Sequence, residues 1–380
     1  MSEYRPLTRC VHSGGYLDEK VGGVTTPVYT SSSYRFSESG GEVLYPRYYN
    51  LPTQKAVADK MAALENGRTA LVVSSGMAAI STTLVALLAA GDHAVIQNDV
   101  YGGTFHFLSE LSRLGIEYSL VRSQDVRDFA AAVRENTRLV YFETPTNPLL
   151  KVVDLRAMAE LGRTKGLLTV IDNTFATPIN QRPLDYGIDV AAHSGTKYLG
   201  GHSDLCCGVV VTRPDLGDKI AETAINHGVV LGAFECYRLE RSLKTLALRV
   251  RQQNVNALAL AEFLAAHPRV KRVYYPGLPD DPGHETAKRQ MSGFGGMFSV
   301  EIKGDRETAR SVVNRLKLFT HAVSLGGVES LVCFPALTSH AKMPAEEREK
   351  IGITDALLRF STGIEDPDDL IADLGQALAG

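Results

Sequence analysis

The sequence predicts a doubly wound α/β domain followed by a smaller α+β domain. Short apolar runs at 69–75, 93–99, 138–145 and 167–174 alternate with segments of helical periodicity at 53–67, 76–91, 104–115 and 154–166. Near-continuous apolar strands separated by helices are typical of a parallel sheet buried on both faces. The length of 380 residues is enough for two or three domains, at roughly 100–200 residues each.

Three regions follow from this pattern. Residues 1–48 are rich in Gly, Ser, Thr and Tyr, and we expect an extended arm that contacts a neighbouring subunit. Residues 49–232 form the predicted α/β domain, with a further strand at 206–212. The predicted α+β domain, 233–380, begins with one long helix over 234–267. It continues with strands at 269–276, 295–302 and 330–335 and helices at 307–316 and 367–378.

Composition argues against several classes of protein. The formal charge is −3, from 40 basic and 43 acidic residues without long runs of one sign, so neither nucleic acid nor a membrane surface is an expected partner. Five scattered cysteines, two of them adjacent, fit neither a disulfide framework nor a zinc site. The first residues lack the apolar core of a signal peptide, and no apolar run spans a bilayer. The expected protein is soluble and cytoplasmic, without a metal.

Candidate site residues are sought just after the strands, because ligands of open α/β sheets bind beyond the strands' carboxyl ends. Gly76 and Met77 open a helix there, and helix N-terminal amides bind phosphate; an ordinary helix start is the alternative. Asp172 ends another apolar run, where a buried carboxylate needs a cationic partner, unless it only caps the next segment. The chain contains neither G-x-G-x-x-G nor G-x-x-x-x-G-K-[ST], which weakens the case for dinucleotides and nucleoside triphosphates.

Lys197 follows the last of these strand ends, in the segment Ser194-Gly-Thr196-Lys197. Alone, it reads as a surface lysine in a loop. Together with Gly76 and Asp172, it completes the set that pyridoxal phosphate (PLP) needs. That set is a phosphate anchor, a carboxylate that keeps the ring nitrogen protonated, and a lysine that forms an imine with the aldehyde. The ordered set therefore predicts a PLP enzyme.

Longer motifs then identify a resemblance along nearly the whole chain. They are TPVYTSSSY, SSGMAA, VYGGTF, ETPTNPLL, VIDNTFATP, HSGTKYLGGHSD, LGAFECY, VSLGGVESL and LLRFSTGIED. In this order they resemble the Cys/Met-metabolism family of PLP enzymes, which includes cystathionine γ-lyase, methionine γ-lyase and cystathionine γ-synthase. The resemblance implies PLP fold type I, with an aspartate-aminotransferase-like large domain and a smaller C-terminal α+β domain.

The resemblance also implies roles for cofactor-binding residues. Lys197 would form the imine and Asp172 would pair with the pyridinium. Tyr101 would stack on the ring and act as acid and base, and Asn147 would approach the ring hydroxyl. The phosphate would be held by the backbone of Gly76 and Met77 and by the hydroxyls of Ser194 and Thr196.

Further roles concern the substrate and the assembly. Arg359 would clamp the substrate α-carboxylate in a bidentate pair, and Ser324 would orient Lys197. Tyr45 and Arg47 would reach the phosphate of a neighbouring subunit, with Tyr45 also near the substrate. This arrangement implies a homotetramer built from two dimers that share active sites.

Three positions depart from the family pattern. Leu51 is inserted in YPRYYNLPT, so the sequence does not determine where the side chains of Tyr45 and Arg47 point. Val323 stands where cystathionine-specific members carry Glu. The apolar side chain favours a pocket for an uncharged distal group of the substrate; the alternative is a substitution without functional meaning at the edge of the pocket. Gly103 replaces a cysteine of methionine γ-lyases, and the segment STGIEDPDDLIADL is closer to the synthases.

The expected activity is carbon–sulfur γ-elimination on cystathionine, methionine or homocysteine, giving 2-oxobutanoate, ammonia and a thiol. The alternative is γ-replacement by a cystathionine γ-synthase or O-acylhomoserine sulfhydrylase, which would use the same residues. An aminotransferase and a non-catalytic scaffold are weaker alternatives.

Overall fold

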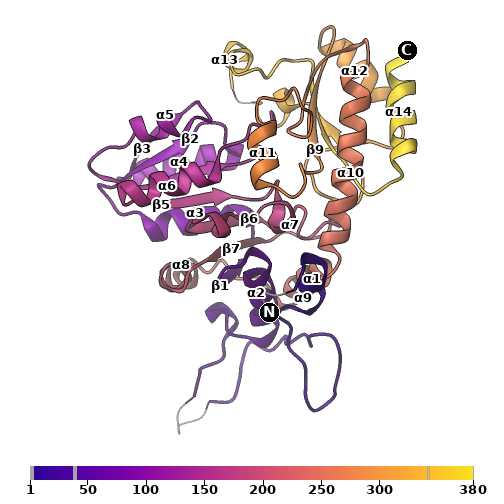
Figure 1. Ribbon diagram of the computed structural model, residues 1–380. Coiled ribbons are helices and arrows are strands. Elements are labelled where there is room, and N and C mark those ends of the chain that lie inside the picture. The colour runs from indigo at the N-terminus through magenta and orange to yellow at the C-terminus, as the bar shows by residue number, and fades with distance from the viewer. Residues whose placement is uncertain (1–3, 37–40, 340, 342, 380) are drawn as a thin grey trace.

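Two β-sheets, each with its own helices, make up the computed structural model, and the long helix α10 lies beside the smaller one (Figure 1). The structure describes residues 4–36, 41–339, 341 and 343–379. The larger sheet has the strand order β1-β7-β6-β5-β4-β2-β3. Its strands are β1 (Thr69–Val73), β2 (His93–Gln97), β3 (Glu117–Val121), β4 (Thr137–Glu143), β5 (Leu168–Asp172), β6 (Val190–Ser194) and β7 (Gly208–Thr212).

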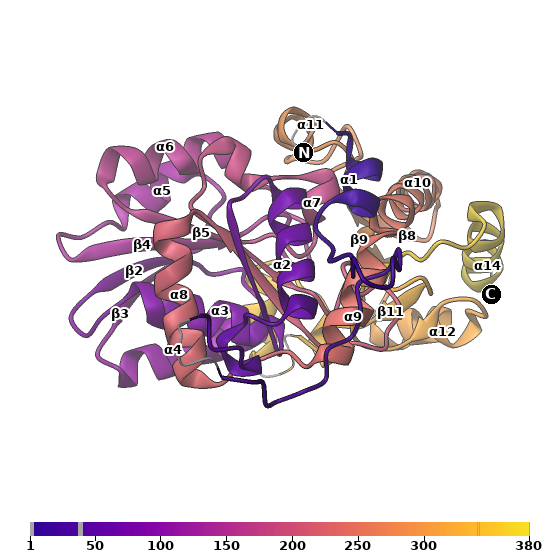
Figure 2. The same cartoon turned by 90° about the horizontal axis from the view of Figure 1, so that it is seen from below.

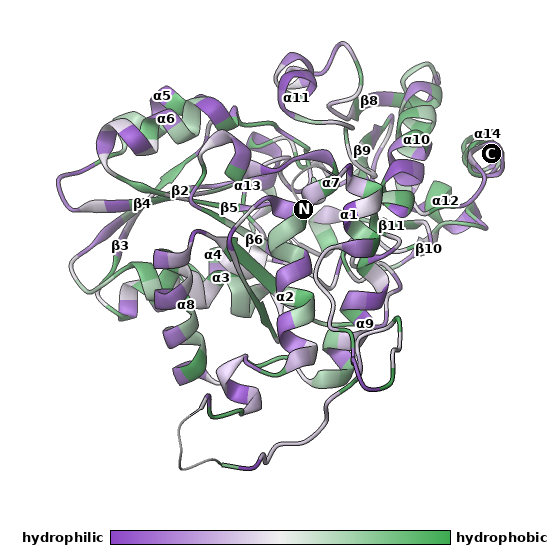
Figure 3. Cartoon of the chain, turned by 60° about the horizontal axis from the view of Figure 1, so that its bottom comes forward, coloured by the Kyte–Doolittle hydropathy of each residue, from purple (hydrophilic) through white to green (hydrophobic). Residues whose placement is uncertain are grey.

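The large sheet is covered on both faces because its strands are apolar at successive positions. Side chains alternate between the two faces of a strand, and here both sets are buried. Leu71 and Val73 of β1 pack in the core on one face, whereas Val72 packs in the core on the other. Val170 and Ile171 of β5 divide in the same way. Strands of the large sheet accordingly carry hydrophobic colours in Figure 3.

Helices lie on both sides of this sheet, as Figure 2 shows for α3, α4 and α8 on one side and α5 and α6 on the other. The helices around the sheet are α2 (Pro52–Glu65), α3 (Gly76–Leu87), α4 (Gly102–Arg113), α5 (Val126–Ala131), α6 (Leu155–Lys165), α7 (Thr177–Asn180) and α8 (Pro214–His227). Short 3₁₀ turns occur at η1 (Pro46–Tyr48) and η2 (Pro183–Tyr186).

One strand of the predicted parallel sheet runs in the opposite direction. β7 runs antiparallel to both of its neighbours, β1 and β6. β7 is buried on both faces like the parallel strands, so its sequence GVVVT has the same apolar character. Composition therefore cannot reveal its direction. The reversal brings the start of β7 to the edge where β1, β4, β5 and β6 end.

The smaller sheet has the order β10-β11-β12-β9-β8. Its strands are β8 (Val270–Tyr274), β9 (Met297–Ile302), β10 (Thr320–His321), β11 (Leu331–Cys333) and β12 (Leu357–Ser361). The surrounding helices are α11 (His284–Gln290), α12 (Arg306–Arg315), α13 (Ala345–Lys350) and α14 (Pro367–Ala379), with a 3₁₀ turn at η3 (Pro335–Leu337). Mixed α and β elements over 270–379 and the α/β architecture over 69–212 agree with the predicted fold class. The domain boundaries after residues 48 and 232 stay a prediction.

The long helix predicted over 234–267 is two helices, α9 (Ala233–Leu243) and α10 (Leu246–Ala265). Lys244 and Thr245 break it, and the buried Arg249 side chain donates hydrogen bonds at the break to Ser242 O (2.9 Å) and Thr245 Oγ1 (3.2 Å). The same guanidinium donates to Tyr198 O (2.7 Å), just after Lys197. This junction therefore stabilises the lysine-bearing loop.

The predicted arm contains one helix that the sequence analysis missed, α1 (Pro6–His12). The buried Lys60 of α2 holds the end of α1 by donating to Cys10 O (3.1 Å) and Val11 O (3.4 Å). The described remainder of the arm is irregular up to Tyr45, and residues 1–3 and 37–40 of the predicted arm lie outside the described residues. Among the described helices, none combines the length and apolar character needed to cross a bilayer.

Candidate active site

A cavity of about 590 Å³ lies where the strand ends of the large sheet meet the smaller sheet. Every site residue predicted from the sequence lines it, except Tyr45 and Arg47. The end of β1 leads into Gly76, β5 ends at Asp172, and β6 ends at Ser194. The smaller sheet and its loops contribute the segment 323–325 and Arg359. The topology therefore gathers residues that are far apart in the sequence.

Lys197 lies in the loop that connects β6 to β7. Its Nζ donates a hydrogen bond to Ser324 Oγ (2.7 Å), so the structure brings these two predicted residues together. Ser324 has a left-handed backbone with φ of 83°, which is uncommon for a residue other than glycine. Burial, and then the positive charge of Arg359, lower the pKa of Lys197. Both effects favour the neutral amine, which is the nucleophilic form.

Asp172 presents a buried carboxylate to the cavity. Its Oδ1 accepts a hydrogen bond from Thr174 N (2.9 Å), and burial raises its pKa. Among the described residues, no basic side chain forms an ion pair with Asp172. A cationic ring nitrogen would provide the charged partner that this carboxylate lacks among the described residues.

The N-terminus of α3 and the end of β6 approach each other closely at Gly76. A Cβ atom at position 76 would lie 2.6 Å from Ser194 Cβ and 2.8 Å from Ser194 Oγ, so only glycine fits. Ser75 caps α3 by accepting from Ala78 N (3.0 Å), while the amides of residues 76 and 77 belong to the helix end that has no intrahelical acceptors. With the hydroxyls of Ser194 and Thr196 on the same cavity, these amides form a cradle suited to phosphate.

Arg359 is buried in β12 and lies beside Asn147. Its guanidinium donates to Asn147 Oδ1 (2.9 Å) and to Ser324 O (3.0 Å). Asn147 was predicted to approach a ring hydroxyl, and in this structure its side-chain oxygen is occupied by the arginine. Arg359 thus faces the cavity from the small sheet while its orientation is set by two neutral oxygens.

Tyr101 precedes α4 and is half exposed at the cavity, with 48 % of its surface accessible. Its ring lies against Gly103, where an added Cβ would approach Tyr101 Cε1 to 2.5 Å and Met77 Sδ to 2.9 Å. A side chain at position 103 would therefore require the Tyr101 ring or the Met77 side chain to shift from this placement.

Tyr45 and Arg47 lie outside the cavity of their own chain. Arg47 donates to Ile225 O (3.0 Å) and its guanidinium lies 5.4 Å from the Tyr48 ring centre. The inserted Leu51 is buried immediately before α2, and its amide donates to Gln54 Oε1 (3.3 Å). The insertion is thus accommodated by packing, and both predicted residues remain near the surface.

Sequence reasoning missed Glu143, Thr174 and Cys206, which also line the cavity. Glu143 is the last residue of β4 and the register partner of Asp172. The rule that led to Asp172, a carboxylate at the end of an apolar strand, would have found Glu143 as well. Thr338 and Ser339 line the cavity from a loop of the small domain that carried no comparable signal.

These contacts fit PLP. The cradle at Gly76 suits its phosphate, the carboxylate of Asp172 suits its protonated ring nitrogen, and the amine of Lys197 suits its aldehyde. All three lie on one cavity of adequate size for a small cofactor and an amino acid.

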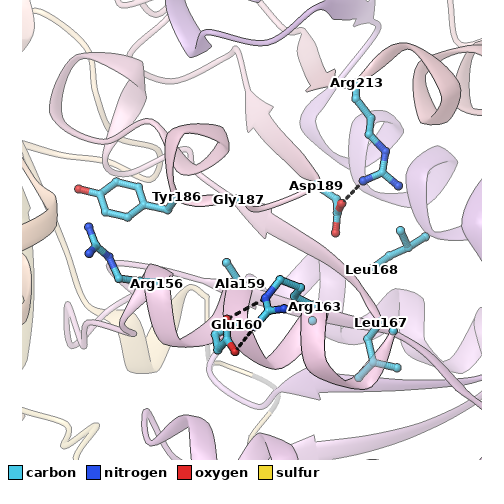
Figure 4. Close-up of a pocket in the computed structure, with 12 residues that line it drawn as sticks. Arg156, Ala159, Glu160, Arg163, Leu167, Leu168, Tyr186, Gly187, Asp189 and Arg213 are labelled. Atoms are coloured by element: carbon cyan, nitrogen blue, oxygen red, sulfur yellow. Dashed lines mark hydrogen bonds and ion pairs between the residues drawn. The ribbon is translucent and has the colours of Figure 1, made fainter.

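A second hollow, of about 500 Å³, lies at the opposite edge of the large sheet (Figure 4). It contains the start of β5 and the residues that precede β6 and follow β7. Two of its arginines are paired with acidic side chains, Arg163 with Glu160 and Arg213 with Asp189, as Figure 4 shows. This hollow lies away from the carboxyl ends of the parallel strands, where ligands of such folds bind.

The fold and the site define a PLP-dependent enzyme of fold type I. The chain belongs to the family described as Cys/Met metabolism PLP-dependent enzyme, whose profile matches residues 7–379. It is similar to cystathionine gamma-lyase of Bacillus subtilis (46% identity over 375 residues, 98% of each chain) and to cystathionine gamma-synthase of Mycobacterium bovis (45% over 378 residues, 98% of this chain and 96% of the other). Lyases and a synthase are therefore about equally similar to it.

Solved structures agree with this assignment. The crystal structure of cystathionine gamma-lyase from Lactobacillus plantarum, complexed with L-serine, superposes with a TM-score of 0.94 at 41% identity, covering 99% of both chains. The predicted fold class, family and cofactor are confirmed. The chain is a lyase or synthase of Cys/Met metabolism that acts on a small amino acid.

Proposed function

We propose that the protein is a carbon–sulfur lyase that catalyses γ-elimination on a sulfur amino acid, cystathionine, methionine or homocysteine. The observation that carries this choice is Val323, which lines the same cavity as Lys197 and Arg359 and is 64% exposed. An apolar side chain there suits the uncharged distal groups of methionine and homocysteine better than the charged distal end of cystathionine. The products are 2-oxobutanoate, ammonia and a thiol.

Arg359 binds the α-carboxylate of the substrate. Its two neutral acceptors, Asn147 Oδ1 and Ser324 O, orient the guanidinium without neutralising it. A carboxylate therefore gains a charge-assisted, bidentate pair that the resting contacts do not supply. This pair fixes the amino acid with its α-carbon facing Lys197.

The cofactor is held by the groups already described: Asp172 at the ring nitrogen, Gly76, Met77, Ser194 and Thr196 at the phosphate, with Tyr101 and Asn147 at the ring. When bound, PLP supplies an aldehyde that captures amino groups and a ring that stabilises negative charge on the substrate carbons. Asp172, lacking a cationic partner among the described residues, keeps the ring nitrogen protonated.

Protons move through Lys197 and Tyr101. The neutral Lys197 Nζ, favoured by burial and by Arg359, removes the proton from the substrate α-carbon. A second proton then leaves the β-carbon, and the electron pair of that C–H bond expels the sulfur from the γ-carbon. Ser324 Oγ, 2.7 Å away, orients this amine. Tyr101 Oη, at the accessible side of the cavity, gives a proton to the departing sulfur.

The assembly completes the site in this proposal. Tyr45 and Arg47 extend from the arm to the phosphate of a neighbouring subunit, because they do not reach the cavity of their own chain. Two such dimers form a homotetramer. The exposed apolar residues Val21, Val24 and Phe36 of the arm are suited to burial against another subunit.

The second candidate function is γ-replacement with an O-acylhomoserine, favoured by the similarity to a cystathionine gamma-synthase. The same residues would serve both reactions, since these differ only in whether the γ-substituent is lost or is exchanged for a thiol.

The test is keto-acid release from cystathionine, methionine and homocysteine without an added thiol. We expect 2-oxobutanoate from at least one of them. Pyruvate from cystathionine would indicate β-elimination, and turnover only with both O-acylhomoserine and cysteine would indicate the synthase; either result overturns the proposal. Conversion of the cofactor to its amine form by added keto acids would instead indicate an aminotransferase.

A further inference from the structure

Two carboxylates lie side by side at the base of the active-site cavity. Glu143 and Asp172 are the last residues of the adjacent parallel strands β4 and β5, and they are register partners. Partners in a parallel pair point to the same face of the sheet, and both side chains line the cavity. Both are buried, with 6% and 9% of their surfaces exposed.

Glu143 also contacts the loop that carries Tyr101. Its Oε1 accepts a hydrogen bond from Tyr101 N at 2.6 Å, and its own amide donates to Gln97 Oε1 at 2.8 Å. Tyr101 immediately precedes α4, and its side chain makes no capping hydrogen bond to that helix. The Glu143 carboxyl therefore links the end of β4 directly to the backbone of Tyr101.

We propose that Glu143 is a positioning residue, which fixes the Tyr101 ring over the cavity through the Tyr101 amide and does so as a neutral carboxylic acid beside Asp172. This inference rests on the proposed function, because Tyr101 matters only if it contacts the cofactor and the substrate.

The charge state follows from the surroundings. Among the described residues, no basic side chain forms an ion pair with Glu143. Two buried carboxylates at neighbouring strand ends repel each other when both are ionised. Burial, and then the Asp172 charge, raise the pKa of Glu143 well above its usual range, and the single hydrogen bond from the Tyr101 amide only partly opposes this rise. Burial raises the pKa of Asp172 as well, and hydrogen bonds from both the side chain and the backbone of Thr174 oppose it. The proton therefore resides on Glu143, and Asp172 keeps the negative charge for the ring nitrogen.

The experiment compares Glu143→Leu with Glu143→Gln. Leucine removes the acceptor and leaves the Tyr101 amide without its partner, whereas glutamine keeps a neutral acceptor of the same length. We expect E143L to bind PLP about 10- to 100-fold more weakly, the cost of an unsatisfied half-buried donor and a displaced ring. We expect E143Q to recover most of that loss. The readout is the dissociation constant of PLP for the apo protein.

A double-mutant cycle distinguishes positioning from general destabilisation. In a Tyr101→Ala background the ring is absent, so E143L should cause little further loss of PLP affinity. Glu301 of β9 offers a matched control, since it is also buried in a strand, pairs with Lys271 (2.9 Å) and lies away from the cavity. E301L should change the melting temperature but not PLP affinity.

The outcomes separate the two proposals. If the wild-type protein binds no PLP, the proposed function fails. If the wild type binds PLP but E143L binds equally well, or E143Q is as impaired as E143L, the role of Glu143 is refuted. The same holds if E143L causes its full loss in the Tyr101→Ala background.

Discussion

Gly76→Ala is the substitution whose effect follows most directly from the structure. The new Cβ would lie 2.6 Å from Ser194 Cβ and 2.9 Å from Ser194 Cα. Ordinary carbon contacts are roughly 3.5–4.0 Å, so α3 and the end of β6 must move apart by about 1 Å. Such overpacking costs about 1–3 kcal/mol, and it falls on the two elements that form the phosphate cradle.

The assay is the dissociation constant of PLP for the apo protein, with thermal unfolding measured in parallel. We expect G76A to bind PLP about 10- to 100-fold more weakly, since about 1.4 kcal/mol is a factor of ten. Gly375 in α14 provides the control, because a Cβ there meets only Phe263 Cζ at an ordinary 3.7 Å. G375A should leave PLP affinity unchanged and stabilise its helix slightly. Unaltered PLP affinity in G76A would refute the assignment of the cradle.

Three further predictions address the core, the carboxylate pair and the pocket edge. Lys60→Met should lower the free energy of unfolding by about 3 kcal/mol in urea titrations, because the buried Glu240 carboxylate and two buried carbonyls lose their ammonium partner. Lys55→Met, at an exposed pair with Glu42, should change it by less than about 1 kcal/mol; equal effects would contradict this. Because the pKa of Glu143 is raised in the folded state, wild-type apo protein loses stability as pH rises above the ordinary glutamate range. The melting temperature of apo E143Q should therefore exceed that of wild type, and the difference between the two should widen from about pH 5 to pH 8. A difference that does not change with pH would count against the raised pKa of Glu143. Val323→Glu should raise the ratio of kcat/KM for cystathionine to that for homocysteine by only a few-fold. The effect is small because an ion pair at such an exposed position contributes about 0.2–1 kcal/mol. An unchanged ratio would place position 323 outside the substrate pocket.

Much of the cavity could be predicted because strand ends in an α/β sheet converge. Gly76, Asp172 and Ser194 were found from their positions after apolar runs, and the topology places all three on one cavity. The same rule also covered Glu143, but a single carboxylate at a strand end is weak evidence without its neighbour. Glu143 and Asp172 form a pair of neighbouring carboxylates only because β4 and β5 are adjacent strands. That adjacency is known from the sheet order and not from the sequence.

Other features depend on tertiary contacts that no local pattern encodes. The direction of β7 was missed because its residues are apolar on both faces whichever way it runs. The break between α9 and α10 is stabilised by Arg249, whose carbonyl acceptors, Tyr198 O, Leu199 O and Ser242 O, come from two separate parts of the chain. The contact of Arg359 with Asn147 joins residues 212 positions apart.

The direct test of the central claim is covalent. Purified protein reconstituted with PLP should absorb near the edge of the visible range and lose that absorbance on borohydride reduction. Peptide mass spectrometry should then find the reduced pyridoxyl group on Lys197. A colourless protein, or a pyridoxyl group fixed to another lysine, would contradict the account.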